Sequence, residues 1–312
     1  MKKVLVIGGT GFIGLNIVKK LISHNVNVSI YDIKKCDQLG IDCFEGNIKD
    51  DVDFCDIISG FDSIIYLITT VSPKKSMENP ELTYIEDIPL LIKTLDACIK
   101  NNVRQVIFAS SGGTIYGDNN GHKSKEEDFN EPINHYGVGK LTCEKILEMY
   151  NKLYGMENIS LRISNPYGLG QNPKSGVGVI TAFTEQVKNG ETINLFGDGS
   201  ITRDFIDVSD VAEAFYLALN WNFDKNINPI FNIGSGKGIT LKQVVNLVYD
   251  VLGKEKNINY LPERPFDVKY SVLDINKAKE YLGYKPDNNE ILKIKKYVEE
   301  KASKEMIKWK SM

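Results

Sequence analysis

The chain has 312 residues, of which 42% are apolar and 25% are charged, and its formal net charge is −3 at pH 7. This is the composition of a soluble globular protein, and the slightly acidic balance argues against a general nucleic-acid binder. No apolar run approaches the roughly 20 residues of a membrane span, so we expect a cytoplasmic protein.

The first predicted elements are a buried strand, a glycine-rich turn, a helix and a second strand that ends on Asp32. They cover residues 3–7, 8–14, 15–21 and 26–31. Glycines in such a turn let backbone N–H groups approach a pyrophosphate, and the helix then points its positive end at the phosphates. Asp32 is placed to accept both hydroxyls of the adenosine ribose, and its charge would repel a 2′-phosphate. The stretch therefore predicts a site for NAD rather than NADP.

Strands and helices continue to alternate along the first half of the chain. Further strands are predicted at residues 43–45, 63–69, 103–109 and 159–163, and helices at 82–100 and 138–154. This βαβα order predicts an α/β fold, a Rossmann-like doubly wound parallel sheet with helices on both faces.

The character of the sequence changes after Asn165, where loops rich in glycine, proline and asparagine separate shorter elements. We expect residues 1–165 to form an NAD-binding Rossmann domain, to which residues 208–233 return as a helix and a strand. Residues 166–207 and 234–312 would form a smaller substrate-binding lobe. Such a lobe would lie beyond the carboxyl ends of the strands, where open parallel sheets bind their ligands.

Candidate catalytic residues follow the strand predicted at 103–109. Ser111 and Thr114 bring hydroxyl groups to the cofactor edge, and Tyr136 and Lys140 come later in the chain. Tyr136 and Lys140 are four residues apart, so on a helix they share one face. An ammonium group beside a phenol, with the positive nicotinamide ring nearby, stabilises the phenolate. The phenolate can take a proton from a sugar hydroxyl while hydride leaves the carbon for NAD.

The three-residue spacing of Gly8, Gly11 and Gly14 resembles that of the extended short-chain dehydrogenases/reductases. With motifs further on, the whole chain resembles the NAD-dependent epimerase/dehydratase family, nearest to the UDP-glucose 4-epimerases. These motifs are LRISNPYG at 161–168, LFGDG at 195–199, RDF at 203–205 and RPFD at 264–267. The resemblance implies a homodimeric NAD-dependent 4-epimerase that converts UDP-hexoses through a transient 4-keto sugar.

The same resemblance implies roles for individual residues. It assigns cofactor contacts to Gly8, Gly11, Phe12, Ile13, Gly14, Asp32, Asn47, Ile48, Tyr136 and Lys140. It assigns the UDP-sugar to Asn165, Phe196, Arg203, Arg264, Asp267 and Ser271. Arginine suits phosphate because a guanidinium binds its oxygens in a bidentate way, although Arg203 could instead pair with Asp204.

A small residue at Ser271 predicts room for an N-acetyl group beside the sugar, because a packed site excludes groups for which it has no volume. UDP-N-acetylhexosamines would then fit as well as UDP-hexoses. The alternative is that the neighbouring Tyr270 rotates in and closes this pocket.

The sequence departs from the family pattern at Gly112, where relatives carry a catalytic serine or threonine. We expect Thr114 to supply the missing hydroxyl, with Ser111 as the next nearest and less important one. Gly113 and Thr114 also replace the carboxylate pair that dehydratases need as acid and base. Asp87 stands where relatives carry asparagine, which implies one cofactor contact fewer. Two alternatives remain open: a nucleotide 4-keto-sugar reductase, and a non-catalytic NAD or nucleotide-sugar sensor.

The five cysteines are odd in number and are never spaced as Cys-x-x-Cys. We expect buried, reduced thiols, and neither a disulfide framework nor a metal site. The first strand is predicted from residue 3, so we expect no signal peptide.

Overall fold

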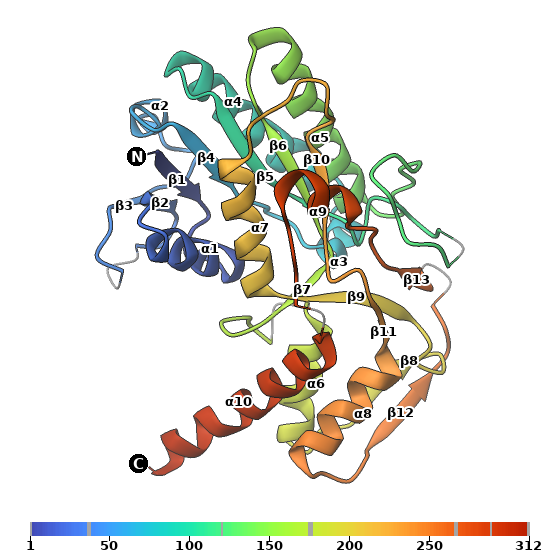
Figure 1. Cartoon of the computed structure of the whole chain (residues 1–312). Helices are drawn as coiled ribbons and strands as arrows, with labels where there is room; N and C mark the ends of the chain where they lie inside the picture. The colour runs from blue at the N-terminus through green and yellow to red at the C-terminus, as the bar shows by residue number, and fades with distance from the viewer. Residues whose placement is uncertain are drawn as a thin grey trace.

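The computed structural model describes residues 2–35, 39–119, 121–173, 177–264, 268–287 and 289–310, with the backbone alone for 304–310. Its larger part is a parallel sheet of seven strands in the order β10-β6-β5-β4-β1-β2-β3, covered by helices on both faces (Figure 1). The α/β fold class predicted from the sequence is confirmed. The strands are β1 (Lys3–Ile7), β2 (Asn27–Asp32), β3 (Cys43–Glu45), β4 (Ser63–Tyr66), β5 (Gln105–Ser111), β6 (Ile159–Ile163) and β10 (Ile230–Ile233).

Both faces of the large sheet are buried against helices. One core contains residues of α1 (Phe12–Ser23), α7 (Val208–Asn220) and α9 (Asn276–Leu282). The other contains residues of α2 (Phe54–Ile57), α4 (Ile88–Lys100) and α5 (His135–Tyr154). In β1, Val4 and Val6 belong to the first core, and Leu5 and Ile7 belong to the second. Successive side chains of a strand point to opposite faces, so this central strand is apolar throughout.

The helix predicted at 82–100 divides into a π-helical turn, η1 (Thr83–Asp87), and α4. Pro89 in the first turn of α4 has no N–H to donate to the carbonyl four residues before it, and its ring crowds that carbonyl. The backbone widens before the proline instead of continuing as an α-helix. A further short helix, α3 (Pro73–Glu78), packs against α5.

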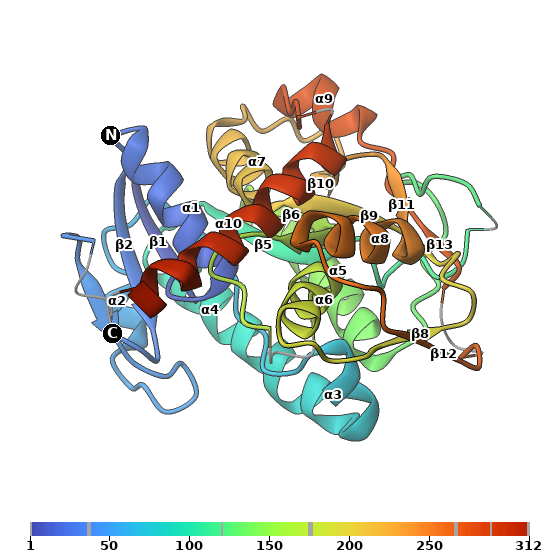
Figure 2. The same ribbon diagram turned by 90° about the horizontal axis from the view of Figure 1, so that it is seen from below.

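The smaller part is built around β9 (Thr202–Asp207), which pairs with three short strands. They are β7 (Asn165–Tyr167), β11 (Gly238–Thr240) and β13 (Tyr270–Ser271). A separate pair is formed by β8 (Ile193–Phe196) and β12 (Ile258–Leu261). A third core lies among α6 (Val179–Lys188), α8 (Leu241–Leu252) and α10 (Glu290–Lys310), which pack together in Figure 2.

Residues 208–233 contribute α7 and β10, and β10 pairs with β6 at the edge of the large sheet. The domain boundaries at 165, 207 and 233 stay a prediction. Within the described ranges, no helix is long and apolar enough to cross a membrane, and no three His, Cys, Asp or Glu side chains are grouped so that they could hold a metal ion.

Among the described cysteines, Cys55, Cys98 and Cys143 are free thiols. Cys98 and Cys143 are buried as expected, whereas Cys43 and Cys55 are only half-buried, so the expectation of buried thiols is wrong for these two. Cys36 lies outside the described residues.

Candidate active site

A cavity of about 560 Å³ lies at the carboxyl ends of β1, β2, β3 and β4. It is lined by Gly8, Thr10, Gly11, Asp32, Asn47, Ile48 and residues 67–70, among others. Five of the ten residues expected to bind the cofactor therefore meet here. Phe12 and Ile13 begin α1 next to this cavity, and Ile13 packs against the adjoining core.

The glycine turn brings the backbone and the start of α1 close together. Gly8 has φ +83°, and a Cβ on Gly14 would lie 2.4 Å from the Gly8 carbonyl oxygen. Gly11 caps α1 without a side-chain hydrogen bond, and the first turn carries no acidic residue. The N–H groups and the positive end of the helix dipole are thus left for an anion.

Asp32 is held at the wall of this cavity. One carboxylate oxygen accepts a hydrogen bond from the Thr10 N–H at 2.9 Å, so the carboxylate lies directly beside the glycine turn. Asn47 uses its side chain within its own turn, donating to Asp50 at 3.1 Å and accepting from the Lys49 N–H at 3.2 Å. The narrow glycine turn, the uncapped helix α1 and the Asp32 carboxylate together fit a dinucleotide. Its pyrophosphate would lie at the start of α1, and its adenosine ribose would lie against Asp32.

The helix that carries Tyr136 and Lys140 is fixed at its first turn. The Asn134 side chain accepts from the Gly137 N–H at 2.8 Å, and the Ser76 hydroxyl of α3 accepts from the Tyr136 N–H at 3.1 Å. Lys140 is buried, and its ammonium donates to the Ala109 carbonyl at 2.9 Å. The same ammonium lies 5.5 Å from the centre of the Tyr136 ring. Ser76 has no sequence signal that would have marked it.

The hydroxyls of Ser111 and Thr114 are joined, because Thr114 donates to Ser111 at 2.9 Å. A Cβ on Gly137 would lie 2.4 Å from the Thr114 carbonyl oxygen, so this turn packs directly on the start of α5. A Cβ on Gly112 would lie 2.6 Å from Leu273. The space of a side chain at 112 is therefore filled by Leu273, which sequence reasoning did not identify.

Asn165, Arg203 and Ser271 come together on neighbouring strands. Ser271 is the register partner of Arg203, and Asn165 is the partner of Phe205 two residues further along β9. Arg203 donates to the carbonyls of Thr202 and Val268 at 2.9 and 2.7 Å. The Asn165 amide donates to the Asp204 carbonyl at 2.9 Å, and its oxygen lies beside Gly113.

The Asp204 carboxylate is fully buried and accepts from the N–H groups of Ser235, Gly236 and Leu273. Burial raises the pKa of Asp204 to about 6, against the lowering effect of these hydrogen bonds. Asp204 thus ties β9 to the segments that follow β10 and β13, while the Arg203 guanidinium bonds to carbonyl oxygens elsewhere. This arrangement does not favour the alternative of an Arg203–Asp204 pair.

Phe196 and Arg264 form a second group, in which the guanidinium lies 4.1 Å from the centre of the ring. Phe196 is the last residue of β8, and Arg264 follows the end of β12 by three residues. Asp267 lies outside the described residues. Asp87, expected to cost a cofactor contact, accepts from the Thr70 N–H at 2.7 Å and from the Thr70 hydroxyl at 2.8 Å. It thereby orders a loop that lines the cavity at the carboxyl ends of β1 to β4.

The chain is similar to known nucleotide-sugar enzymes. Residues 4–234 match the model of the NAD dependent epimerase/dehydratase family. A Thermotoga maritima UDP-glucose 4-epimerase, solved with UDP-glucose, is 34% identical with a TM-score of 0.87, covering 95% of this chain and 97% of that one. A Methanobrevibacter ruminantium UDP-N-acetylglucosamine 4-epimerase is 30% identical with a TM-score of 0.88, covering 97% and 99%. An Escherichia coli dTDP-4-dehydro-6-deoxyglucose reductase is 32% identical over 91% of this chain and 92% of its own.

Proposed function

The chain belongs to the NAD-dependent epimerase/dehydratase family, and we propose that it is a UDP-sugar 4-epimerase, an isomerase that acts through a transient 4-keto sugar. The observation that carries this proposal is the placement of the Lys140 ammonium 5.5 Å from the centre of the Tyr136 ring. This pair begins a helix that packs on the Ser111–Thr114 turn, next to residues suited to a sugar diphosphate. NAD is the cofactor, and when bound it accepts and returns the hydride of the sugar C4.

The remaining chemistry falls to the side chains of this protein. Tyr136 takes the proton of the 4-hydroxyl as a general base, and Lys140 favours its phenolate form. Arg203, Arg264 and Asn165 hold the UDP part of the substrate. Because the nucleotide anchors the molecule, the 4-keto sugar can turn about the diphosphate and present its other face. Tyr136 then returns the proton, and the configuration at C4 is inverted.

A nucleotide 4-keto-sugar reductase is the second candidate, supported by the similarity to the Escherichia coli reductase. The two functions differ in the fate of the cofactor. An epimerase needs no net reductant and is expected to keep NAD through purification. A reductase would consume reduced cofactor in proportion to product. Assaying the purified protein both ways separates them, and a protein that does neither would be a sensor.

The hydrogen bond between Thr114 and Ser111 makes their hydroxyls one unit, so the sequence-based order of importance changes. Thr114 donates to Ser111, which leaves the Ser111 proton available to the substrate. We expect Thr114→Val and Ser111→Ala each to lower kcat several-fold to about tenfold, the cost of one neutral hydrogen bond. The double variant should be little worse than either single one, because coupled groups are non-additive. Independent, multiplying effects in steady-state kinetics would contradict this.

Substrate choice at the sugar depends in this proposal on Ser271, which is buried beside Arg203. The ring of Tyr270 lies against Gly238 of β11, which favours an open pocket over one closed by Tyr270. We expect conversion of both UDP-glucose and UDP-N-acetylglucosamine. Ser271→Tyr should abolish activity on the N-acetylated sugar alone, because its ring would fill the space of the acetamido group.

Tyr270→Phe is the matched control and should change neither activity. If UDP-glucose alone is converted and Ser271→Tyr leaves this unchanged, the pocket is assigned wrongly although the epimerase stands. The substrate-binding role of residues 166–207 and 234–312 is part of the same proposal.

We also propose a homodimer, for which exposed apolar side chains on η1 and α5 provide support. Ile85 is 64% exposed and Leu153 is 65% exposed, on elements that pack against each other. A second copy covering this face would remove both from water. Light scattering should give twice the monomer mass, and Leu153→Asp with Ile85→Asp should halve it. A wild-type monomer would contradict the proposal.

A further inference from the structure

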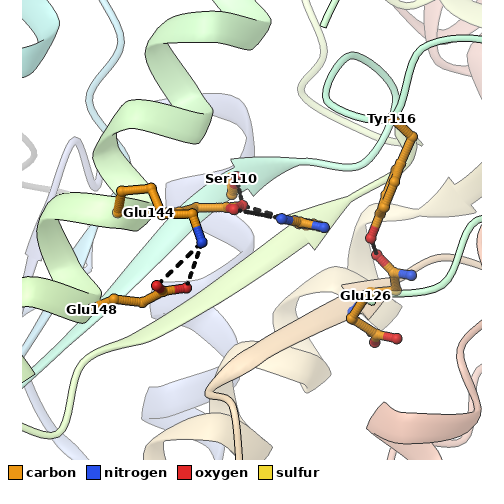
Figure 3. A network of polar contacts seen from close by, with 8 residues as sticks. Ser110, Tyr116, Glu126, Glu144 and Glu148 are labelled. Atoms are coloured by element: carbon orange, nitrogen blue, oxygen red, sulfur yellow. Dashed lines mark hydrogen bonds and ion pairs between the residues drawn. The ribbon is translucent and has the colours of Figure 1, made fainter. Parts of the chain in front are cut away.

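A buried ion pair lies directly behind the proposed catalytic pair. Glu144 follows Lys140 by one turn of α5, and its side chain is 0% exposed, while that of Arg162 on β6 is 1% exposed. The Arg162 Nη2 donates to Glu144 Oε2 at 2.7 Å, and its Nε donates to Glu144 Oε1 at 3.0 Å. Glu144 Oε1 also accepts from the Ser110 hydroxyl at 2.5 Å. Figure 3 shows the Glu144 side chain pointing from the helix toward Ser110 at the end of β5.

Three successive residues of β5 each accept a hydrogen bond from, or donate one to, a side chain outside the strand. The Ala109 carbonyl accepts from Lys140, the Ser110 hydroxyl donates to Glu144, and the Ser111 hydroxyl accepts from Thr114. Glu144 thus fixes the strand between the lysine and the hydroxyl pair. Its removal would loosen both attachments at once.

Glu144 and Arg162 carry opposite charges, and the Arg162 guanidinium keeps its positive charge. Burial lowers the pKa of the Arg162 guanidinium, but the hydrogen bonds and attraction of Glu144 outweigh this and hold that pKa above its ordinary value. Arginine does not lose its proton in proteins. A change at Glu144 would therefore leave one uncompensated positive charge in the interior.

Resting on the proposed function, we propose that Glu144 is a positioning residue whose charge cancels that of Arg162 and so keeps the buried guanidinium from lowering the pH at which Tyr136 accepts a proton. Glu144 is eight residues from Tyr136 on the same helix, about 12 Å by the rise of an α-helix. At an effective dielectric constant of about 20, one unit charge at that distance moves an ionisation by about one pH unit.

Other ionisable groups lie near Tyr136 and near the Glu144–Arg162 pair. Burial raises the pKa of Tyr66, of Tyr116 and of Cys143, so these groups stay neutral near pH 7. Charged groups nearby, in the part of the chain that the structure describes, include Lys140, Asp87 of η1, Glu126 beyond Tyr116, and Lys277, which faces both Glu126 and Arg162. His135 and Tyr84 bond to each other next to Tyr136. All of them are the same in the variants compared below.

The test compares Glu144→Gln with the double variant Glu144→Gln/Arg162→Gln, using the pH dependence of kcat/KM. Glutamine keeps one carbonyl oxygen to accept from the Arg162 guanidinium and an amide N–H that the Ser110 hydroxyl can accept, but it removes the charge. The unpaired charge of Arg162 then favours the phenolate of Tyr136. The acid limb of the kcat/KM profile, where activity falls as pH decreases, should therefore move about one pH unit lower. The double variant has no net change in charge and should return the limb to its wild-type position.

A purely structural role would lower stability or kcat in both variants and leave the acid limb where it is, and that result would overturn the proposal. Near-ultraviolet titration of each protein against its Tyr136→Phe counterpart measures the same ionisation without turnover. Should Glu144→Gln not fold, Arg162→Gln carries the opposite expectation, an acid limb moved upward, and an unmoved limb overturns the proposal. A wild-type protein that epimerises no UDP-sugar would instead refute the proposed function.

Discussion

Tyr136→Phe is expected to lower epimerase turnover by roughly 10²–10⁴, the usual contribution of a general acid–base group. The phenol is the group at this site that can take the 4-hydroxyl proton next to the Lys140 ammonium. Phenylalanine keeps the ring and removes only the hydroxyl, so thermal stability should not change. The measurement is kcat on UDP-glucose, with bound NAD and the unfolding temperature recorded for the same preparation.

Tyr154→Phe provides the matched control, because Tyr154 ends the same helix and is 54% exposed. It should have wild-type activity. Full activity in Tyr136→Phe would show that another group moves the proton and would remove the basis of the mechanism.

Alanine substitutions at two glycines of the same turn are expected to affect stability and NAD affinity differently. A Cβ on Gly14 would lie 2.4 Å from the Gly8 carbonyl oxygen and 2.8 Å from Gly9 backbone atoms, so Gly14→Ala must displace backbone. We expect a lower unfolding temperature and NAD affinity reduced by roughly a hundredfold, about 2.7 kcal/mol. A Cβ on Gly11 meets nothing closer than 3.4 Å. Gly11→Ala should keep the free energy of unfolding to within about 1 kcal/mol of the wild type. It should still lose NAD affinity, because Gly11 lines the cavity at the carboxyl ends of β1 to β4.

Calorimetric titration with NAD and thermal unfolding of the protein without cofactor distinguish the two. If Gly14→Ala unfolds like the wild type, the turn tolerates a methyl group at this position and its close packing does not limit stability. If Gly11→Ala binds NAD normally, the pyrophosphate does not approach that residue.

The nucleotide end of the molecule could be predicted from sequence because its constraints are local. An apolar strand, a glycine turn and an acid at the end of the next strand follow one another within 32 residues. Asp32 accordingly lies against the turn through the Thr10 N–H. The fold class followed from the alternation of strands and helices for the same reason.

Features that depend on distant parts of the chain could not be predicted. The widening at η1 results from Pro89, whose effect depends on which carbonyl it crowds. The role of Glu144 depends on Arg162, which belongs to a different strand and looks in sequence like any other strand residue. The two-residue strand β13 has too few residues to show a period, yet it brings Ser271 beside Arg203.

Leu273 and Gly112 are far apart in sequence but share one volume, and this constrains the order in which the chain can change. Leu273 is 1% exposed within the core, so it cannot easily move aside for a side chain at 112. A serine at 112 would meet Leu273 at 2.6 Å and the Arg162 carbonyl at 3.1 Å. An evolutionary path that restores a hydroxyl there must first shorten residue 273. In a library of variants at both positions, serine at 112 should survive selection for activity only with a small residue at 273.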